Sequence, residues 1–564
     1  MSMVRFRLRV ILSVLLILFV LLVCRLFYLQ VIQYQFYKAK LVAQTRRSIP
    51  LQAQRGDIYD CNGLLLATSI DADTVYVYTP SIVTNKDAVA ESLAQILHLN
   101  AQTMKTRFNG ESVYLLIKRR ISDEETLALK QAHLPGVCLV KDQQRVYLRD
   151  ALAAHTLGFV DAENNGMGGI EYSFERFLQG IPGKVVLERD PSGKEIYASN
   201  RILSAPHDGD HVQLTIDEFL QYIVRKELKQ GVVHSRADSG TAIIMDVRTG
   251  EILALAAYPD YNPNRYYEYS AAARSNIAVQ NVYEPGSIFK LITMATAINE
   301  GLVSPNEPYV NGNEFTHAGA TIHEAHHLKD PLRQRRIADI VIESLNIGAA
   351  RVALQIGRFR LYNYMERFQL TKKTNLGLPG ESPGIVKKPE LWGPTDEAII
   401  GFGQSFSLTP IQVAAAIAVI ARDGTYIRPT IVKRIFDRRG KILKEYAKSP
   451  DTRRVISAET AQKMRSIMLD VVEKGTGAAA RVPGYSIGGK TGTSQKPNPN
   501  GKGYLASSYV GSFVGFIPNY RPRILILVTI DNPRGEYYGG AVAAPVFRAI
   551  ATEAIRYLAI PPDM

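Results

Sequence analysis

The sequence predicts a multidomain α+β protein that follows a single N-terminal transmembrane helix. A chain of 564 residues is too long to fold around one hydrophobic core. Behind an apolar N-terminal run, segments with the two-residue period of strands alternate with segments that have the period of helices. The expected parts are a tail over residues 1–9, an anchor over 10–29, a β-rich domain over 30–205 and a second domain over 210–564.

The anchor is predicted from an apolar run that begins after Arg5, Arg7 and Arg9 and continues to Leu29, with Arg25 near its end. Its length suits a bilayer. A cleaved signal peptide is the competing interpretation, but no small-x-small site follows the run. Lipoprotein processing at Cys24 is disfavoured because bulky Val23 precedes it. We therefore expect an uncleaved anchor with the N-terminus inside, since a long C-terminal domain translocates largely regardless of loop charge.

Charge and cysteine content narrow the class of protein. The formal net charge is +14, but the basic residues are scattered and no nucleic-acid motif accompanies them, so no nucleic-acid partner is expected. The three cysteines, Cys24, Cys61 and Cys138, are too few for a disulfide framework. A bridge between Cys61 and Cys138 stays open in an oxidising compartment, and two free thiols are the favoured interpretation.

The first domain should open with a hairpin over residues 55–67, because Asn62-Gly63 lies between two strand-like segments. Amphipathic helices are expected over residues 86–99 and 123–132. His155 is interpreted as a packed histidine with satisfied hydrogen bonds, not as a chemical group. The segment 201–209, which contains Pro206, reads as the boundary before the second domain.

The second domain contains the segment with the strongest chemical signal, Tyr283 to Lys290. Pro285-Gly286 ends what precedes it, and an apolar helical pattern follows, so Ser287 should sit in the first turn of a buried helix. Lys290 lies one turn further on the same face. Burial lowers the pKa of a lysine, and a neutral amine can take the proton of a serine hydroxyl. Taken alone, this pair is explained about equally well by a surface serine and lysine that are three residues apart by chance.

Two further motifs follow in order: Ser344-Leu345-Asn346 at a turn between helical runs, and Lys490-Thr491-Gly492-Thr493 after a strand-like run. The ordered set S-x-x-K, S-x-N and K-T-G is the signature of penicillin-binding proteins and serine β-lactamases. The segment 55–67 also resembles the box that opens the non-catalytic domain of class B penicillin-binding proteins, with Cys61 where an arginine is usual. Segments 154–159, 168–171 and 401–404 resemble further boxes. From anchor to C-terminus, the chain resembles a class B penicillin-binding protein.

This resemblance implies a role for each motif residue. Ser287 would be the nucleophile and Lys290 its base, and Ser344 would relay a proton between Lys490 and the leaving group. Asn346 would hydrogen-bond Lys290 and the amide backbone of the substrate.

The K-T-G segment would bind the end of the substrate. Lys490 would supply positive charge for a terminal carboxylate, and the hydroxyls of Thr491 and Thr493 would donate to it. Gly492 lets the strand approach a ligand closely. The backbone amides of Ser287 and Thr493 would form an oxyanion hole, and segment 401–404 would support the cleft.

The resemblance further implies a β-rich pedestal of the dimerisation type and a transpeptidase domain with helices around a central antiparallel sheet. The enzyme would cross-link peptidoglycan stem peptides ending in D-Ala-D-Ala, without a metal or cofactor, and would be acylated by β-lactams. It would sit as a single-pass protein in the bacterial cytoplasmic (inner) membrane with its catalytic domain outside. A polytopic membrane glycosyltransferase and other division proteins are the expected partners, because the septal type fits better than the elongation type.

Other functions remain open at this stage. A D,D-carboxypeptidase uses the same trio with water as the acceptor. A β-lactamase needs a carboxylate that activates water, and none can be placed in the sequence. An inert scaffold or a β-lactam sensor is opposed by the intact trio and the short N-terminal tail. Residues 323–327 satisfy H-E-x-x-H, but Gly319 and Pro331 flank them without helical periodicity, so a loop or hairpin is expected there instead of a zinc site.

Overall fold

The computed structural model describes residues 2–564 except 84, 111, 189–200, 327, 447–450, 499–500 and 502. The chain divides into two compact units. Unit 1 consists of Met1–Gln54 and Gly180–Gly209, and unit 2 consists of Arg55–Gln179 and Asp210–Met564. Unit 2 therefore contains most of the expected pedestal together with the whole expected transpeptidase domain.

Unit 1 begins with helix α1 (Ser2–Phe27), whose apolar side chains are all exposed. A π-helical turn over Tyr28–Ile32 continues it, and helix α2 (Tyr34–Thr45) follows. Together Ser2–Ile32 are long and apolar enough to cross a membrane. The rest of the unit is an antiparallel sheet in the order β1-β6-β7, with strands at Arg46–Leu51, Gly183–Glu188 and Arg201–Ser204.

Unit 2 contains a seven-stranded sheet that links the two halves of the sequence. Strand β2 (Ile58–Tyr59) turns back through Asn62-Gly63 into β3 (Leu65–Tyr78), so the predicted hairpin is confirmed. On its other side β2 runs parallel to β8 (His211–Leu214), which belongs to the second predicted domain. The order is β17-β16-β8-β2-β3-β4, with β5 also on β3; the remaining bounds are Ile442–Glu445 (β17), Val432–Phe436 (β16), Tyr114–Ile121 (β4) and Val137–Tyr147 (β5).

Three helices cover β3 and β4 and close a small hydrophobic core of their own. They are α3 (Lys86–Ile96), α4 (Ala101–Phe108) and α5 (Asp123–Ala132). Helix α5 has the predicted bounds because Ser122 and Glu125 form a reciprocal capping box at its start. Helix α3 ends three residues before the predicted limit of the helix at Leu99.

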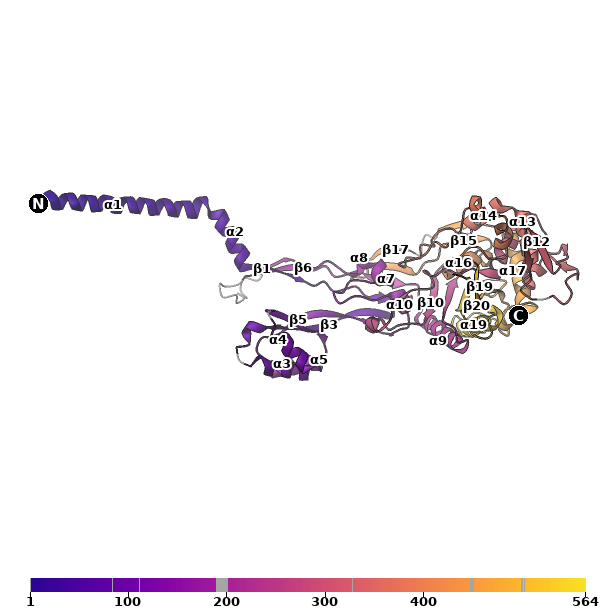
Figure 1. Cartoon of the computed structure of the whole chain (residues 1–564), viewed down its shortest axis with the longest axis horizontal. Coiled ribbons are helices and arrows are strands. Elements are labelled where there is room, and N and C mark those ends of the chain that lie inside the picture. Colours follow the sequence, from indigo (N-terminus) through magenta and orange to yellow (C-terminus); the bar gives the residue numbers. More distant parts are fainter. Residues whose placement is uncertain are drawn as a thin grey trace. The chain divides into compact units, whose positions relative to one another are not determined.

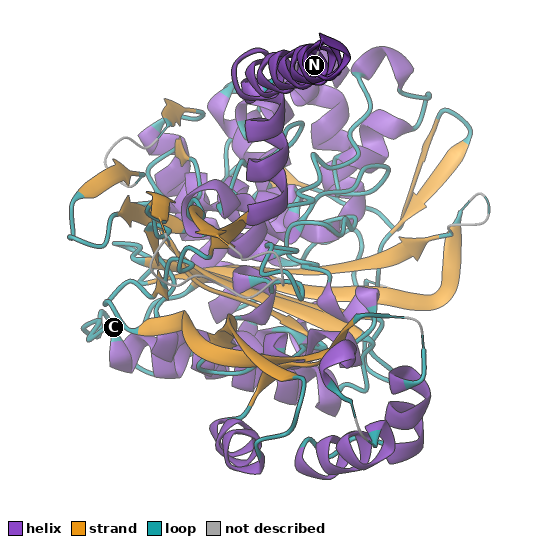
Figure 2. Ribbon diagram, turned by 90° about the vertical axis from the view of Figure 1, so that its left-hand side faces the viewer, coloured by secondary structure: helices purple, strands orange, loops and turns teal. Residues whose placement is uncertain are grey.

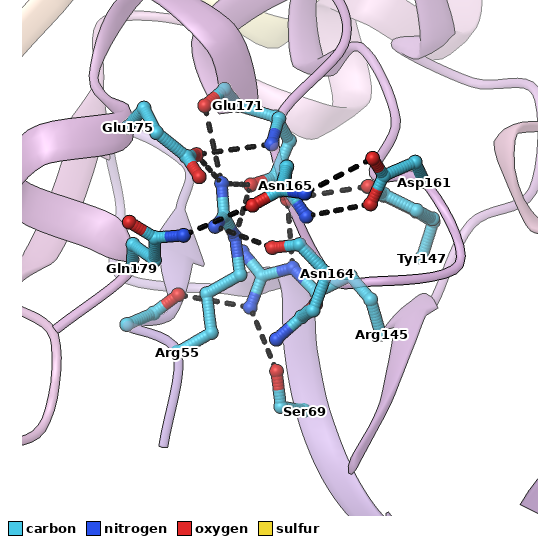
Figure 3. Close-up of polar contacts among 12 residues, drawn as sticks. Arg55, Ser69, Arg145, Tyr147, Asp161, Asn164, Asn165, Glu171, Glu175 and Gln179 are labelled. Carbon is cyan, nitrogen blue, oxygen red and sulfur yellow. Dashed lines mark hydrogen bonds and ion pairs between the residues drawn. The ribbon is translucent and has the colours of Figure 1, made fainter. Parts of the chain in front are cut away.

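A buried ion cluster joins the boxes of the first half of the chain (Figure 3). Arg55 donates from Nε to Glu171 Oε2 at 2.7 Å, and Arg145 donates from Nε to Glu171 Oε1 at 2.7 Å. Glu171 is fully buried, and Arg55 also reaches Glu175 and the carbonyl of Asn164. The two guanidinium groups lower the pKa of Glu171 against the opposing effect of burial. The cluster thereby gives segments 55–67 and 168–171 a structural role in the first half of the chain.

The second sheet of unit 2 is antiparallel and has five strands in the order β10-β9-β21-β20-β19. Their bounds are Ser239–Asp246 (β9), Ile252–Tyr258 (β10), Gly488–Pro497 (β19), Tyr504–Ile517 (β20) and Ile524–Asp531 (β21). Successive side chains enter different cores: Ile243 and Leu527 join one cluster, whereas Ile244 and Val528 join the other. Since both faces are apolar, both must be covered.

Helices cover both faces of this sheet, as Figures 1 and 2 show. Helices α9 (Glu218–His234) and α19 (Ala544–Tyr557) pack on one face. The other face holds α11 (Lys290–Asn299), α13 (Asn346–Ile356), α16 (Pro410–Ala421) and α17 (Ala458–Glu473). This is the predicted arrangement of helices around a central antiparallel sheet, with β19 at its edge.

Two smaller predictions are also confirmed. His155 is buried, and its Nε2 lies 2.9 Å from the carbonyl oxygen of Ala273, so it is a packed histidine. Cys24, Cys61 and Cys138 are free cysteines, which excludes the Cys61–Cys138 bridge in this structure.

Candidate active site

The nucleophile segment begins with a 3-10 turn over Gly286–Ile288, and helix α11 starts at Lys290. Ser287 therefore lies one turn before the α-helix, not in its first turn as predicted. The reason is Gly286, whose φ of 52° starts the chain in a left-handed conformation that the helix cannot continue. Ser287 is half-buried and lines a cleft, whereas Lys290 is 1% exposed.

Glycines allow close packing of three backbone segments next to Ser287: those at Gly286, Gly403 and Thr493. A Cβ atom on Gly286 would lie 2.9 Å from the carbonyl oxygen of Thr493, and a Cβ on Gly403 would lie 2.0 Å from the carbonyl oxygen of Gly286. The amide of Gly286 donates to the carbonyl of Gly403 at 3.0 Å. The segment 401–404 thus supports the nucleophile turn directly, as the resemblance implies.

Lys290 is connected to the S-x-N motif by two short hydrogen bonds. Its Nζ donates to the carbonyl oxygen of Ser344 at 2.6 Å and to Oδ1 of Asn346 at 2.7 Å. Burial lowers the pKa of Lys290 from 10.5 to about 7, and the charge of Glu324 opposes this change. A neutral amine has two N–H groups, and both find acceptors here. The lone pair of Nζ then remains free to accept a proton from another group.

Ser344 stands at the turn between α12 (Asp339–Ile342) and α13, as predicted. Its φ of 64° is unusual for a residue with a side chain, and such strain is typical of functional sites. The Oγ of Ser344 accepts a hydrogen bond of 2.9 Å from Nζ of Lys490. Ser344 therefore connects both lysines: one through its carbonyl oxygen and the other through its hydroxyl.

The K-T-G segment lies on β19, the edge strand of the five-stranded sheet. Thr491 Oγ1 lies 2.8 Å from Thr476 Oγ1, and Thr493 Oγ1 accepts from the amide of Gly539 at 3.1 Å. A Cβ on Gly492 would lie 2.3 Å from Ser512 Oγ, so no side chain fits there. Backbone groups on an edge strand can bind an extended peptide in the manner of an added strand.

Lys490 is completely buried, and its side chain does not reach into the open cleft. Burial and the neighbouring charge of Lys290 place the pKa of Lys490 well below its ordinary value. Its Nζ also contacts the carbonyl of Thr491 at 3.2 Å. A substrate carboxylate would thus meet the hydroxyls of Thr491 and Thr493 first, with Lys490 behind them.

A cleft of about 550 Å³ brings the motifs together. Five of the predicted site residues line it: Ser287, Ser344, Asn346, Thr491 and Thr493. Lys290, Lys490 and Gly492 are buried and are not among the residues that line it. The structure thereby unites three motifs that are separated by more than half of the second domain in sequence.

Glu324 is a site residue that the sequence analysis missed. Its carboxylate accepts from the backbone amides of Asn346 at 2.7 Å and Ile347 at 2.9 Å, at the start of α13. It belongs to the H-E-x-x-H segment, where His323 ends strand β13 (Ala320–His323) in a hairpin with β12 (Glu314–His317). The predicted hairpin is confirmed for these residues, and His327 lies outside the described ones. No local pattern points from Glu324 to Asn346, because their contact is purely tertiary.

An aromatic wall of the cleft was also missed. Tyr509, Tyr537 and Tyr538 line it, and the rings of Tyr509 and Tyr537 stack with centroids 4.1 Å apart. Tyr538 in turn packs against His326 at 4.6 Å. These rings offer apolar contact to a peptide held on β19. The sequence shows the Tyr537-Tyr538 pair but not its distance from Ser287.

The matched domain models cover both halves of the chain. Residues 240–552 match the penicillin binding protein transpeptidase domain, and residues 50–214 match the penicillin-binding protein dimerisation domain.

Similar proteins cover nearly the whole chain. Stage V sporulation protein D of Bacillus subtilis is 32% identical over 556 residues, which are 97% of this chain and 85% of that protein. Peptidoglycan D,D-transpeptidase FtsI of Escherichia coli is 31% identical over 96% of this chain and 90% of its own length. The structure of penicillin binding protein 3 from Mycobacterium tuberculosis complexed with ampicillin has a TM-score of 0.73 at 27% identity, covering 91% of this chain and 97% of that one. The chain therefore belongs to the class B penicillin-binding proteins.

Proposed function

We propose that the protein is a membrane-anchored D,D-transpeptidase that cross-links peptidoglycan stem peptides through an acyl-enzyme on Ser287. The observation that carries this proposal is the buried connection from Lys290 through Ser344 to Lys490, in a cleft that Ser287 lines. In this arrangement Lys290 would serve as the general base for Ser287, and Ser344 and Lys490 would provide a separate proton path.

In acylation, neutral Lys290 removes the proton of Ser287, and Oγ forms a bond to the carbonyl carbon of the penultimate D-Ala. The oxyanion of the tetrahedral intermediate would be held by the backbone amides of Ser287 and Thr493. When the C–N bond breaks, the amine of the terminal D-Ala needs a proton. Ser344 donates it and is reprotonated by Lys490, so the leaving group departs neutral and Lys290 stays protonated.

Deacylation reverses these steps with a new amine. The acceptor amine of a second stem peptide attacks the ester carbon and gives its proton to Ser344, which passes its own proton to neutral Lys490. Lys290 returns a proton to the Oγ of Ser287 as the ester bond breaks. If water takes the place of the amine, the same site acts as a D,D-carboxypeptidase. Asn346 would orient Lys290 and the donor peptide, while Thr491 and Thr493 would bind its terminal carboxylate.

The wider biological assignment rests on the relatives and the anchor. FtsI-type D,D-transpeptidases among the relatives favour the septal type over the elongation type. We place the N-terminal tail over residues 1–9 inside the bacterial cytoplasmic membrane, the anchor over 10–29, and the catalytic domain outside. The pedestal over 30–205 and the transpeptidase domain over 210–564 would act together with a polytopic glycosyltransferase and other division proteins.

The test separates transfer from hydrolysis. Detergent-solubilised full-length protein is incubated with a pentapeptide donor ending in D-Ala-D-Ala and an isotopically labelled D-amino acid as acceptor. Mass spectrometry should show a product in which the labelled amine replaces the terminal D-Ala, and Ser287→Ala should form none. Release of D-Ala without incorporation of the label would replace the transpeptidase with a carboxypeptidase. No turnover of either kind by folded protein would favour the scaffold.

A further inference from the structure

Unit 2 has a second large cleft, which we call the arginine cleft, with a volume of about 1070 Å³. It lies where the β9–β10 turn, the end of α16, the β20–β21 turn and the last residues of the chain meet. The two short paired strands β15 (Thr425–Ile427) and β18 (Thr452–Arg454) contribute Thr425, Thr452 and Arg454. None of its lining residues lines the catalytic cleft.

The charge of this cleft is strongly positive and comes from arginine alone. The charged lining residues are Arg248, Arg422, Arg454, Arg521 and Arg523, with Asp423 and Asp563. Both carboxylates have other partners: Asp423 pairs with Arg465 at 2.7 Å, and Asp563 accepts from the amide of Ser486 at 2.7 Å. The five arginines outnumber the two aspartates, so the lining keeps a net positive charge.

Three of the five guanidinium groups have no partner among the described residues: those of Arg422, Arg521 and Arg523. Nη1 of Arg422 is buried without a hydrogen-bond partner. A buried donor that is left unsatisfied costs free energy, and a charged one costs more. The site is thus built to gain from an oxyanion that enters it, and a planar guanidinium suits a carboxylate or phosphate in a two-point contact.

The other walls decide between these oxyanions. Tyr520 is 62% exposed, and the exposed rings of Pro561 and Pro562 stand beside the arginines. A phosphate polymer has no apolar group that could pack on these rings. A peptide with apolar residues between its carboxylates can contact the rings and the arginines at once. We propose that the arginine cleft binds an extended acidic peptide segment of a partner protein. Such a site would tether the enzyme without taking part in acyl transfer.

The test measures binding of a fluorescent decapeptide of alternating Glu and Leu to full-length protein in neutral detergent. The cleft variant carries R422Q, R521Q and R523Q. The matched control carries R236Q, R439Q and R548Q, three exposed arginines elsewhere that change the net charge equally. We expect at least about tenfold weaker binding by the cleft variant, a change within about twofold for the control, and weaker binding by wild type as salt rises.

Acylation of Ser287 by penicillin verifies that each variant is folded, and it should not change. If the triple cleft variant is no longer acylated, peptide binding is compared with the double variant R521Q/R523Q instead. This variant should fold, since Arg521 is exposed and Arg523 is partly exposed. Equal loss of binding in the cleft and control variants would overturn the proposal, as would a wild-type protein that does not bind the peptide. Binding of polyphosphate that requires these arginines, without binding of the peptide, would replace the peptide with a phosphate polymer.

Discussion

Lys290 is the residue on which the proposed chemistry depends, because it must be neutral to act as a base. Its surroundings make this feasible: burial lowers the pKa to about 7, and its Nζ meets two oxygen acceptors. A lysine with its ordinary pKa would be almost entirely protonated at neutral pH.

The pH dependence of acylation tests this property. Since only the neutral amine accepts the proton of Ser287, the rate of penicillin acylation should rise as the pH increases through about 7 and then level off. Stopped-flow measurement between pH 5.5 and 9 gives the midpoint. A midpoint near 10 would show that Lys290 keeps an ordinary pKa, and Lys290→Arg should be inactive throughout.

Glu324 gives a second prediction at this scale. Its charge raises the pKa of Lys290, so Glu324→Gln should move the midpoint of the acylation profile to lower pH. The loss of two charged acceptor contacts at the start of α13 should also cost about 1–3 kcal/mol in the free energy of unfolding. Glu314→Gln, at an exposed position of the same hairpin, is the control and should leave the profile unchanged. A profile of Glu324→Gln that equals this control would contradict the role.

At this scale the sequence identified the motif residues but not their supports. Ser287, Ser344 and Lys490 could be found because their spacing patterns are short and ordered. Glu324 and Tyr509 could not, because each reaches the site only when strands and loops distant in sequence come together. The deep burial of Lys490 was also not foreseen, since a charged residue in a motif suggests direct contact with a ligand.

At the scale of elements, the nucleophile turn is held by backbone packing between Gly286 and Gly403. Gly403→Ala would place a Cβ 2.0 Å from the carbonyl oxygen of Gly286 and should displace the turn. Gly440 has a similar φ of 81° but no atom within 4 Å of its Cβ position, so Gly440→Ala is the matched control. It should cost about 1–2 kcal/mol through its backbone conformation alone.

We expect Gly403→Ala to lose well over 90% of penicillin acylation, or about 2 kcal/mol or more in the activation free energy. It should also unfold at lower urea concentration than Gly440→Ala. Equal activity and stability of the two variants would show that the close approach of the backbones is unimportant.

Elements with local signals could be predicted well. The hairpin at Asn62-Gly63 and helix α5 follow from turn and capping chemistry within a few residues. The start of α11 could not be placed, because the left-handed conformation of Gly286 is set by its contacts with Thr493 and Gly403. Propensity alone favours a helix that begins before Ser287.

At the scale of the whole molecule, the buried cluster of Arg55, Arg145 and Glu171 holds unit 2 together at its N-terminal end. Removing one charge from such a cluster leaves the others uncompensated. Glu171→Gln should therefore destabilise the protein by about 3–5 kcal/mol. Glu163→Gln breaks the exposed pair with Arg119 and should cost less than about 1 kcal/mol. Urea unfolding of both variants gives the comparison.

The sign of the pH dependence follows from the lowered pKa of Glu171. Its contribution is present above the ordinary pKa of 4.5 and is lost as the pH falls through the lower value of the folded state. The difference in unfolding free energy between wild type and Glu171→Gln should thus shrink only below pH 4.5. A difference that is small at pH 7 would contradict the structural role of the cluster.

The large-scale topology lies beyond sequence patterns. A parallel contact between β2 and β8 joins strands from the two predicted domains, so the compact unit does not follow the boundary at residues 205–210. Local composition predicts a boundary there because the segment contains Pro206. Composition cannot reveal that β8 joins the same sheet as β2, because this pairing depends on residues far apart in the sequence.

The most direct test of the central claim is intact-protein mass spectrometry after exposure to penicillin. Wild-type full-length protein should gain the mass of one intact drug molecule, peptide mapping should locate it on Ser287, and the adduct should persist far longer than one turnover. Ser287→Ala should gain none. Rapid loss of the adduct with release of hydrolysed drug would indicate a β-lactamase. A folded wild-type protein that forms no adduct would contradict the acyl-enzyme mechanism.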